Sequence, residues 1–137
     1  MVASTALYGF CPVFNTSNRK FGNAAAEFDG NDNISITDTN LLDLTGDYTI
    51  FAWIYPKGFG GGGQGRIVDK HDGTSSGYRM WISGIGAIPN KLLFATDGTT
   101  TDDLIGTVQL NACQLATVTK DSSSIKVYMN GILIYQT

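Results

Sequence analysis

Hydrophobic and polar residues alternate with a period of two along most of the chain, which is the pattern of half-buried β-strands. The pattern predicts about ten short strands separated by turn residues, at 26–28, 33–36, 47–56, 66–70, 77–83, 91–96, 104–110, 115–119, 124–129 and 132–135. Only residues 40–44 have the composition of a helical turn. Short strands at this close spacing predict an all-β fold in which antiparallel sheets form a sandwich or barrel.

Two segments of the pattern carry most of the fold prediction. Segment 47–56 is apolar on both of its faces, with Ile50 on one and Phe51 on the other, which predicts a central strand covered on both sides. Near the end of the chain, Asn130-Gly131 separates two alternating runs. This dipeptide favours a two-residue hairpin, because a type I′ turn needs a positive φ at both positions.

Composition and charge narrow the class of protein. With 137 residues, 42% of them hydrophobic and 15% charged, we expect a single folded domain over residues 1–137. The net charge of −3 and the scattered Lys and Arg residues argue against nucleic-acid binding. No apolar run is long enough to span a membrane. The first residues lack the basic segment of a signal peptide, so the sequence leaves the compartment open.

Acidic residues are arranged in a way that argues against glycosidase activity. Retaining glycosidases hold two carboxyl groups about 5 Å apart, often on alternate residues of one strand. This chain has a single glutamate, Glu27, and no strand with such a pair. Residues 73–77 match the G-x-S-x-G pattern, but they lie in a turn-rich loop and not between a strand and a helix. We therefore expect no catalytic residues and no enzymatic activity.

The two cysteines, Cys11 and Cys113, allow two interpretations. Two free, buried thiols are favoured, because a domain of this size does not need a disulfide to fold. The alternative is one disulfide that ties the N-terminal region to the rest of the domain. With a single histidine, His71, the chain cannot assemble a four-ligand Cys/His zinc site.

Aspartates in the predicted turns are candidate ligands for calcium, which prefers several hard oxygen atoms from loops. The same residues are common in turns because their carboxylates accept hydrogen bonds from their own backbone, and this second interpretation is favoured. The candidate calcium ligands are Asp29, Asp32, Asp69 and Asp72, and Asp97, Asp102 and Asp103 are further acidic loop residues.

Strand 77–83 contains the first candidate for ligand contact. Alternation places Arg79 and Trp81 on one face, where an indole could stack on a sugar ring and a guanidinium could donate to its hydroxyls. Lys126 and Tyr128 share a face of the last hairpin and would extend the patch. The alternative, slightly favoured for Trp81, is that this ring belongs to the hydrophobic core.

Several segments, in order, resemble the laminin G-like, concanavalin A-like lectin/glucanase family. They are 20–22, 26–30 (AEFDG), 34–36, 42–50 (LDLTGDYTI), Trp53-Ile54, 67–70 (IVDK), 116–120 and 126–131 (KVYMNG). The resemblance covers about residues 21–133 and implies a two-sheet antiparallel jelly-roll sandwich. It also implies an extracellular or virion-associated module that binds glycans or glycoproteins, often with calcium at the rim of the sandwich.

The sequence departs from the family pattern in ways that change what we expect. Cys113 stands where the family usually has a tryptophan, and no acidic residue precedes Glu27 at the family's common calcium position. The chain also ends two residues after its last predicted strand, where the family continues with closing strands. We therefore expect open sheet edges and a homo-oligomer. A structural or assembly protein that oligomerises through those edges is the alternative to a glycan-binding module.

Overall fold

The fold is described from a computed structural model of the chain, which covers residues 13–71, 76–84, 90–96, 99–100 and 107–137. The chain divides into two compact units, residues 1–38 and residues 39–137. The prediction of one domain over residues 1–137 stays a prediction. No helix in the described ranges is long and apolar enough to cross a membrane.

The N-terminal unit contains one small hairpin. Strands β1 (Val13–Asn15) and β2 (Ala25–Glu27) pair antiparallel, with Phe14 opposite Ala26. The Asn15 side chain organises the start of the connection, because its Oδ1 accepts hydrogen bonds from the backbone N–H groups of residues 17 and 18. Its amide nitrogen donates to the Glu27 carboxylate. The only glutamate of the chain thus has a structural role in this hairpin.

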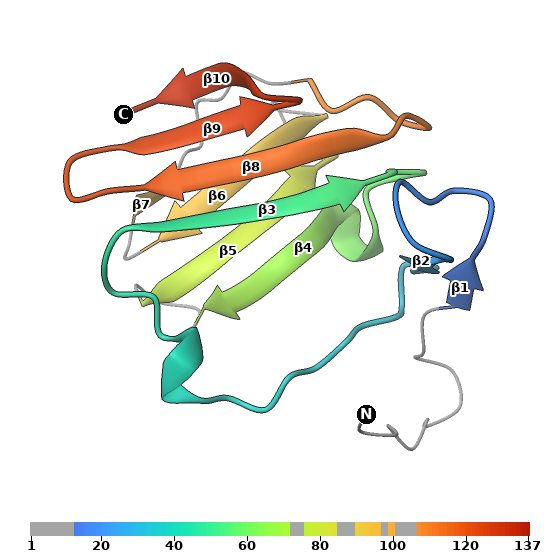
Figure 1. Cartoon of the computed structure of the whole chain (residues 1–137), viewed down its shortest axis with the longest axis horizontal. Coiled ribbons are helices and arrows are strands. Elements are labelled where there is room, and N and C mark those ends of the chain that lie inside the picture. The colour runs from blue at the N-terminus through green and yellow to red at the C-terminus, as the bar shows by residue number, and fades with distance from the viewer. Residues whose placement is uncertain (1–12, 72–75, 85–89, 97–98, 101–106) are drawn as a thin grey trace. The chain divides into compact units, whose positions relative to one another are not determined.

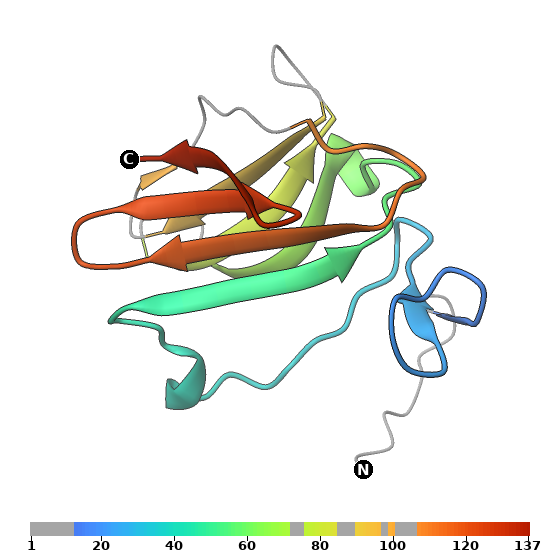
Figure 2. The same cartoon turned by 45° about the horizontal axis from the view of Figure 1, so that its top comes forward.

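The C-terminal unit is a sandwich of two antiparallel four-stranded sheets, and in Figure 1 the β10-β9-β8-β3 sheet lies in front of the other. Figure 2 shows the same two layers from a tilted direction. The first sheet has the order β10-β9-β8-β3, and the second has the order β4-β5-β6-β7. The strands are β3 (Tyr48–Ile54), β4 (Gln64–His71), β5 (Gly77–Ser83), β6 (Lys91–Thr96), β7 (Thr99–Thr100), β8 (Gln114–Lys120), β9 (Ile125–Met129) and β10 (Ile132–Gln136). Two 3-10 turns, η1 (Asn40–Leu42) and η2 (Gly61–Gly63), precede β3 and β4.

The hydrophobic core lies between these sheets and is built from alternate residues of each strand. The second sheet contributes Met80, Ile82, Leu92 and Phe94, and the first contributes Ala116, Val118, Val127 and Met129. Burial of these facing side chains removes apolar surface from water, which is the dominant stabilising term in folding. The alternation of buried and less buried positions in β9 follows directly from the strand period of two.

Tyr48 links the two sheets through several contacts. Its ring lies 6.1 Å from the ring of Tyr78 and 6.5 Å from that of Phe94, measured between centroids. Its hydroxyl donates to Thr96 Oγ1 at 2.9 Å, which satisfies a polar group at the edge of the core. The Lys120 ammonium lies 5.7 Å from the centroid of the same ring. One aromatic side chain therefore joins β3 to β5 and β6 across the sandwich.

The all-β, antiparallel fold class that the alternating pattern predicts is confirmed. The last hairpin is confirmed in detail, since Asn130 and Gly131 both have a positive φ, of 53° and 79°. The helical turn predicted at 40–44 is present as η1. Strands β1 and β7 are additions that the pattern did not predict.

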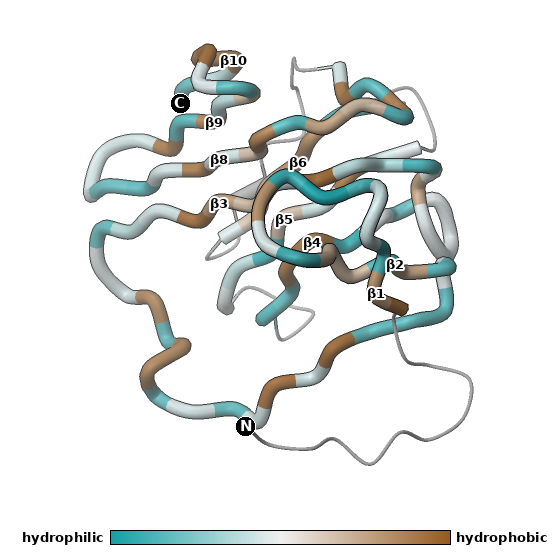
Figure 3. Tube along the Cα trace, turned by 45° about the vertical axis from the view of Figure 1, so that its right-hand side comes forward, coloured by the Kyte–Doolittle hydropathy of each residue, from teal (hydrophilic) through white to brown (hydrophobic). Residues whose placement is uncertain are grey.

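Two strand predictions are wrong where the structure describes them. Residues 33–36 form no strand, and both Ile34 and Ile36 are well exposed. In Figure 3 the stretch between β2 and β3 contains hydrophobic segments similar to those in the strands. Alternation of hydrophobic and polar residues therefore does not by itself distinguish this segment from a strand. Of the strand predicted at 104–110, residues 104–106 lie outside the described ranges, and Thr107 forms only an isolated bridge with Lys91.

The prediction that segment 47–56 is a central strand covered on both faces is also wrong. Strand β3 stands at the end of its sheet and pairs only with β8 in the described part of the chain. Its outward residue Phe51 is 67% exposed and Trp53 is 40% exposed. Both faces are apolar in sequence, but only one of them packs against the second sheet.

Cys113 is exposed and free, so the prediction of a buried thiol is wrong for this residue. It lies in the short connection before β8 and not inside the sandwich. Its predicted counterpart, Cys11, lies outside the described residues.

The buried ring of Phe94 should matter far more for stability than the exposed ring of Phe51. We expect Phe94→Ala to lower the free energy of unfolding by about 3–5 kcal/mol, because it leaves a cavity in the core. Phe51→Ala should change that free energy by no more than about 0.5 kcal/mol. Urea unfolding followed by circular dichroism measures both. Equal losses for the two variants would contradict the position of the core.

The β8–β9 turn depends on the carboxylate of Asp121. It accepts hydrogen bonds from the backbone N–H and hydroxyl of Ser123 and from those of Ser124, at 2.8–3.0 Å. These bonds, led by the Ser123 N–H, hold the pKa of Asp121 far below the usual range of an aspartate. A lowered pKa stabilises the fold at neutral pH, and this contribution is lost as the pH falls below the ordinary aspartate range.

We therefore expect Asp121→Asn to lower the melting temperature at neutral pH and to flatten the loss of stability on acidification. Thermal unfolding of both proteins between neutral and strongly acidic pH tests this. An unchanged pH dependence in the variant would show that Asp121 does not contribute. Asp47→Asn is the control, because Asp47 is an exposed aspartate immediately before β3.

The start of β5 requires a glycine. Gly77 has a φ of +93°, and a Cβ atom there would lie 1.9 Å from the Lys70 carbonyl oxygen on the paired strand. We expect Gly77→Ala to cost about 1–3 kcal/mol or more, since the backbone must move. Gly46→Ala is the control, because the same methyl group meets nothing within 4 Å there. Chemical denaturation of both variants measures the difference, and similar losses would contradict the close approach at Gly77.

Candidate functional site

The outward side of the β10-β9-β8-β3 sheet carries a group of large apolar and aromatic side chains, which we call the aromatic face. It consists of Phe51, Trp53, Leu115, Tyr128 and Leu133. Phe51, Trp53 and Leu133 are each at least 40% exposed, and the other two are half-buried. Contiguous exposed apolar surface on a folded unit marks a place of interaction, because it is costly to leave in water.

Strand register brings these residues together from distant parts of the sequence. Phe51 lies opposite Thr117 on β8, Thr117 lies opposite Tyr128 on β9, and Tyr128 lies opposite Leu133 on β10. A single row thus crosses all four strands. Trp53 and its partner Leu115 form the next row. Outward side chains of one sheet stand side by side, so the aromatic face is a platform and not a deep pocket.

Polar groups border the platform in the neighbouring row, Thr49–Thr119–Lys126–Gln136. Their hydroxyl, ammonium and amide groups can exchange hydrogen bonds with a polar ligand that lies across the rings. The Lys126 ammonium is 3.8 Å from the Asp121 carboxylate, so part of its charge is balanced. Aromatic rings beside neutral hydroxyl groups are suited to an uncharged, hydroxylated ligand.

The residues predicted to contact a ligand are divided between the two sheets. Lys126 and Tyr128 lie on the outward side of β9, and Tyr128 belongs to the aromatic face. Arg79 and Trp81 lie on β5, in the other sheet, and on the side of that strand opposite the core residues Met80 and Ile82. The four residues therefore do not form one patch. A ligand role for Lys126 and Tyr128 stays a prediction.

Trp81 is buried, as the slightly favoured interpretation of its sequence position has it, and it does not offer the exposed indole that a ligand role requires. Its side chain is 5% exposed and packs with Leu93 and Ala95 in a second, smaller cluster, with Tyr135 beside it. The guanidinium carbon of Arg79 lies 4.6 Å from the centroid of the Trp81 ring, so the arginine covers the indole. The buried Nε of Arg79 has no hydrogen-bond partner among the described residues. The alternative interpretation, that Trp81 serves packing, is the one that its burial supports.

The predicted calcium ligands have other partners where they are described. The Asp29 carboxylate accepts from the Asn31 N–H at 2.9 Å, and Asp32 accepts from the Asp29 N–H at 3.1 Å, as the turn interpretation predicts. Asp69 pairs with the Arg66 guanidinium in the C-terminal unit. Asp72, Asp97, Asp102 and Asp103 lie outside the described ranges. Within those ranges no three metal-ligating side chains are grouped, and calcium binding stays a prediction.

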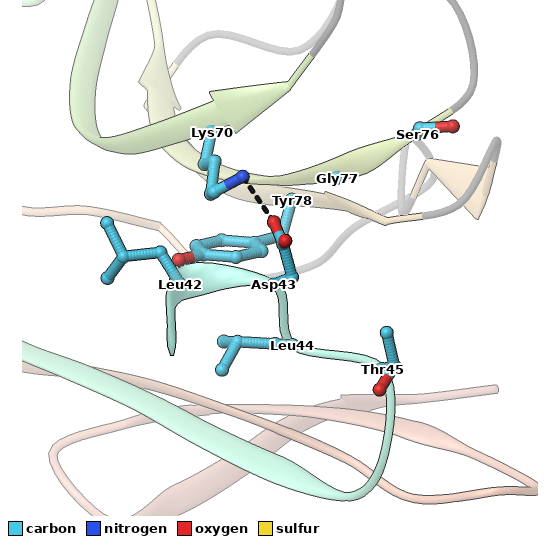
Figure 4. Close-up of a pocket in the computed structure, with 8 residues that line it drawn as sticks. All are labelled: Leu42, Asp43, Leu44, Thr45, Lys70, Ser76, Gly77 and Tyr78. Atoms are coloured by element: carbon cyan, nitrogen blue, oxygen red, sulfur yellow. Dashed lines mark hydrogen bonds and ion pairs between the residues drawn. The ribbon is translucent and has the colours of Figure 1, made fainter. Parts of the chain in front are cut away.

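A pocket of about 280 Å³ opens at one end of the sandwich, where the chain enters β3 and where β4 meets β5 (Figure 4). The Lys70 ammonium and the Asp43 carboxylate point toward one another in it, with 2.6 Å between Nζ and Oδ1. The ring of Tyr78 lies beside this pair. Because the two charges already satisfy one another, the pocket offers a weaker reason for ligand binding than the aromatic face.

Sequence reasoning missed Phe51 and Trp53 as surface residues. The available signal was that both the odd-numbered and the even-numbered residues of 48–54 are apolar. This pattern fits either a strand covered on both sides or a strand with one exposed apolar face. The pairing of β3 with β8, and of β8 with β9, decides between these two possibilities. The sequence of a single strand does not determine which residues of other strands lie opposite it.

Comparison with known proteins agrees with this architecture. Residues 28–137 match the laminin G-like family model described as the concanavalin A-like lectin/glucanases superfamily. No match is found among curated proteins or among solved structures. Laminin G-like domains are generally binding modules without catalytic activity. Because the match spans well over half of the chain, the protein belongs to the concanavalin A-like lectin/glucanase superfamily.

Proposed function

We propose that the protein is a non-catalytic module that binds glycans, free or on glycoproteins, through the aromatic face. The observation that carries the proposal is the row of exposed Phe51 and half-buried Tyr128, with exposed Trp53 beside it, on the outward side of one sheet. Sugar rings present C–H groups that stack on aromatic rings, and their hydroxyls bond to neighbouring polar side chains. The match to the laminin G-like branch of the superfamily, whose domains are generally binding modules, supports the same class of function.

The form of the face favours an extended chain over a single sugar. Phe51 and Trp53 are two residues apart on β3, which separates them by about 6.6 Å along the strand. Tyr128 is two strands away from Phe51, at a spacing of about 10 Å across the sheet. A ligand that contacts all three rings must therefore cover several neighbouring positions. The absence of acidic side chains from the face itself and from its Thr49–Gln136 border favours neutral or mildly acidic polysaccharides.

We expect Phe51→Ala and Trp53→Ala each to weaken glycan binding about tenfold, because each removes one stacking ring. Binding is measured first on an array of neutral and acidic polysaccharides, and then by calorimetry with the best ligand. Leu41→Ala is the matched control, since Leu41 is 90% exposed in η1 and is not part of the aromatic face. It should bind like the unchanged protein.

A parallel titration with excess calcium or with a chelator addresses the aspartates that the sequence predicts as ligands. Stacking on the rings needs no metal, so binding should persist after chelation. The proposal is wrong if no glycan binds, or if the two aromatic variants and the Leu41 control bind equally well. Melting temperatures of all variants confirm that each is folded.

A further inference from the structure

The outward row of exposed side chains on β3 continues beyond the end of the strand. From Thr49 to Tyr55 the odd-numbered residues are exposed and the even-numbered residues are half-buried, and this alternation passes Ile54, the last residue of β3, without a break. Successive side chains of an extended chain point to opposite sides, which places Tyr55 on the same side as Phe51 and Trp53. Tyr55 is 36% exposed and is not among the residues of the aromatic face.

The chain just after β3 is held in an extended form. Pro56 follows Tyr55, and a proline disfavours helical backbone angles in the residue that precedes it. Pro56 is buried, and its carbonyl oxygen accepts a hydrogen bond from the Asn111 N–H at 2.7 Å. These two constraints keep Tyr55 in line with the strand, so its ring is held in place before any ligand binds.

The most exposed aromatic rings of this sheet therefore form a line along β3. Phe51, Trp53 and Tyr55 are all exposed, whereas Tyr128, two strands away, is half-buried. The rise of a strand puts neighbouring rings of the line about 6.6 Å apart and the first and last about 13 Å apart. A single sugar ring is too small to contact all three, but an extended chain can follow them.

Strand β8 supplies polar groups beside this line. Thr117 lies opposite Phe51, and Thr119 lies opposite Thr49, with both hydroxyl-bearing side chains of β8 half-buried on the outward side. A hydroxyl group can both donate and accept a hydrogen bond. The outward residues from Thr49 to Tyr55 carry no charge. Stacking rings next to neutral hydroxyls suit an uncharged polymer that is itself rich in hydroxyl groups.

We infer that one polysaccharide chain binds parallel to β3, over Phe51, Trp53 and Tyr55, and that Tyr55 is a contact residue of the site. The inference rests on the proposed function and adds to it the direction and the minimum length of the ligand. Each ring of the line takes at least one sugar unit. A chain that lay across the strands would instead contact Phe51 and Tyr128 and would not reach Tyr55.

Substitutions of the two tyrosines separate these directions. Calorimetry is done with the polysaccharide that binds best on the array. We expect Tyr55→Ala to weaken binding about tenfold, as Phe51→Ala does, and Tyr128→Ala to weaken it about threefold or less. Tyr55→Phe should bind like the unchanged protein, because it keeps the ring. If Tyr55→Ala does not fold, Tyr55→Leu has the same expected effect, since it keeps apolar bulk without a flat ring.

Oligosaccharides of the same polysaccharide, from the disaccharide to the hexasaccharide, give the second arm. The affinity of the unchanged protein should rise with length until the ligand spans all three rings, and then level off. In Tyr55→Ala the affinity should level off at a shorter length, because the last ring of the line is missing. A purely structural effect of the substitution would lower the affinity for every length alike.

Equal binding by Tyr55→Ala and the unchanged protein would overturn the inference, and losses in Phe51→Ala and Trp53→Ala would still support the proposed function. A larger loss in Tyr128→Ala than in Tyr55→Ala would place the ligand across the strands and also overturn it. So would a loss in Tyr55→Ala that is the same at every oligosaccharide length. If no glycan binds and a proline-rich peptide binds instead, the inference and the proposed function are both wrong.

Discussion

The structure of the C-terminal unit depends on one constraint: each of its sheets has an apolar side that must be buried against the other. Met80 and Phe94 from one sheet and Val118 and Val127 from the other meet between the layers and are fully buried. Because successive side chains of a strand point to opposite faces, this burial also fixes which residues point away from the core. The packing of the core therefore also determines which residues form the aromatic face.

The elements that could be predicted from sequence are those in which local pattern and local chemistry agree. The β9–β10 hairpin is one, because Asn130 and Gly131 tolerate the positive φ values that its turn needs. Residues 33–36 show the limit of the method. Ile34 and Ile36 alternate with polar residues as in a strand, but the structure gives them no partner strand. Alternation describes one strand, whereas a sheet requires two, and the second is distant in sequence.

The same limit explains why the residues of the candidate site could be predicted only in part from the sequence. Alternation correctly paired Arg79 with Trp81 and Lys126 with Tyr128, but it could not show that β5 and β9 belong to different sheets. Nor could it show that Trp81 has a second layer of packing from Leu93. Phe51 joined the row of Tyr128 only through Thr117, at sequence distances that no local pattern spans. Hydrophobicity predicts that a residue needs cover, and topology decides whether the cover comes from the protein or from a partner.

Strand β3 combines two features that proteins usually avoid in one element, an apolar outward face and an edge without charge or bulge. Either feature alone could be neutral, because single exposed apolar residues are common on protein surfaces. On β3 both occur within the same seven residues, and Phe51 and Trp53 are the exposed rings among them. The exposed rings of Phe51 and Trp53 are costly to leave in water, and a stacking ligand would cover them.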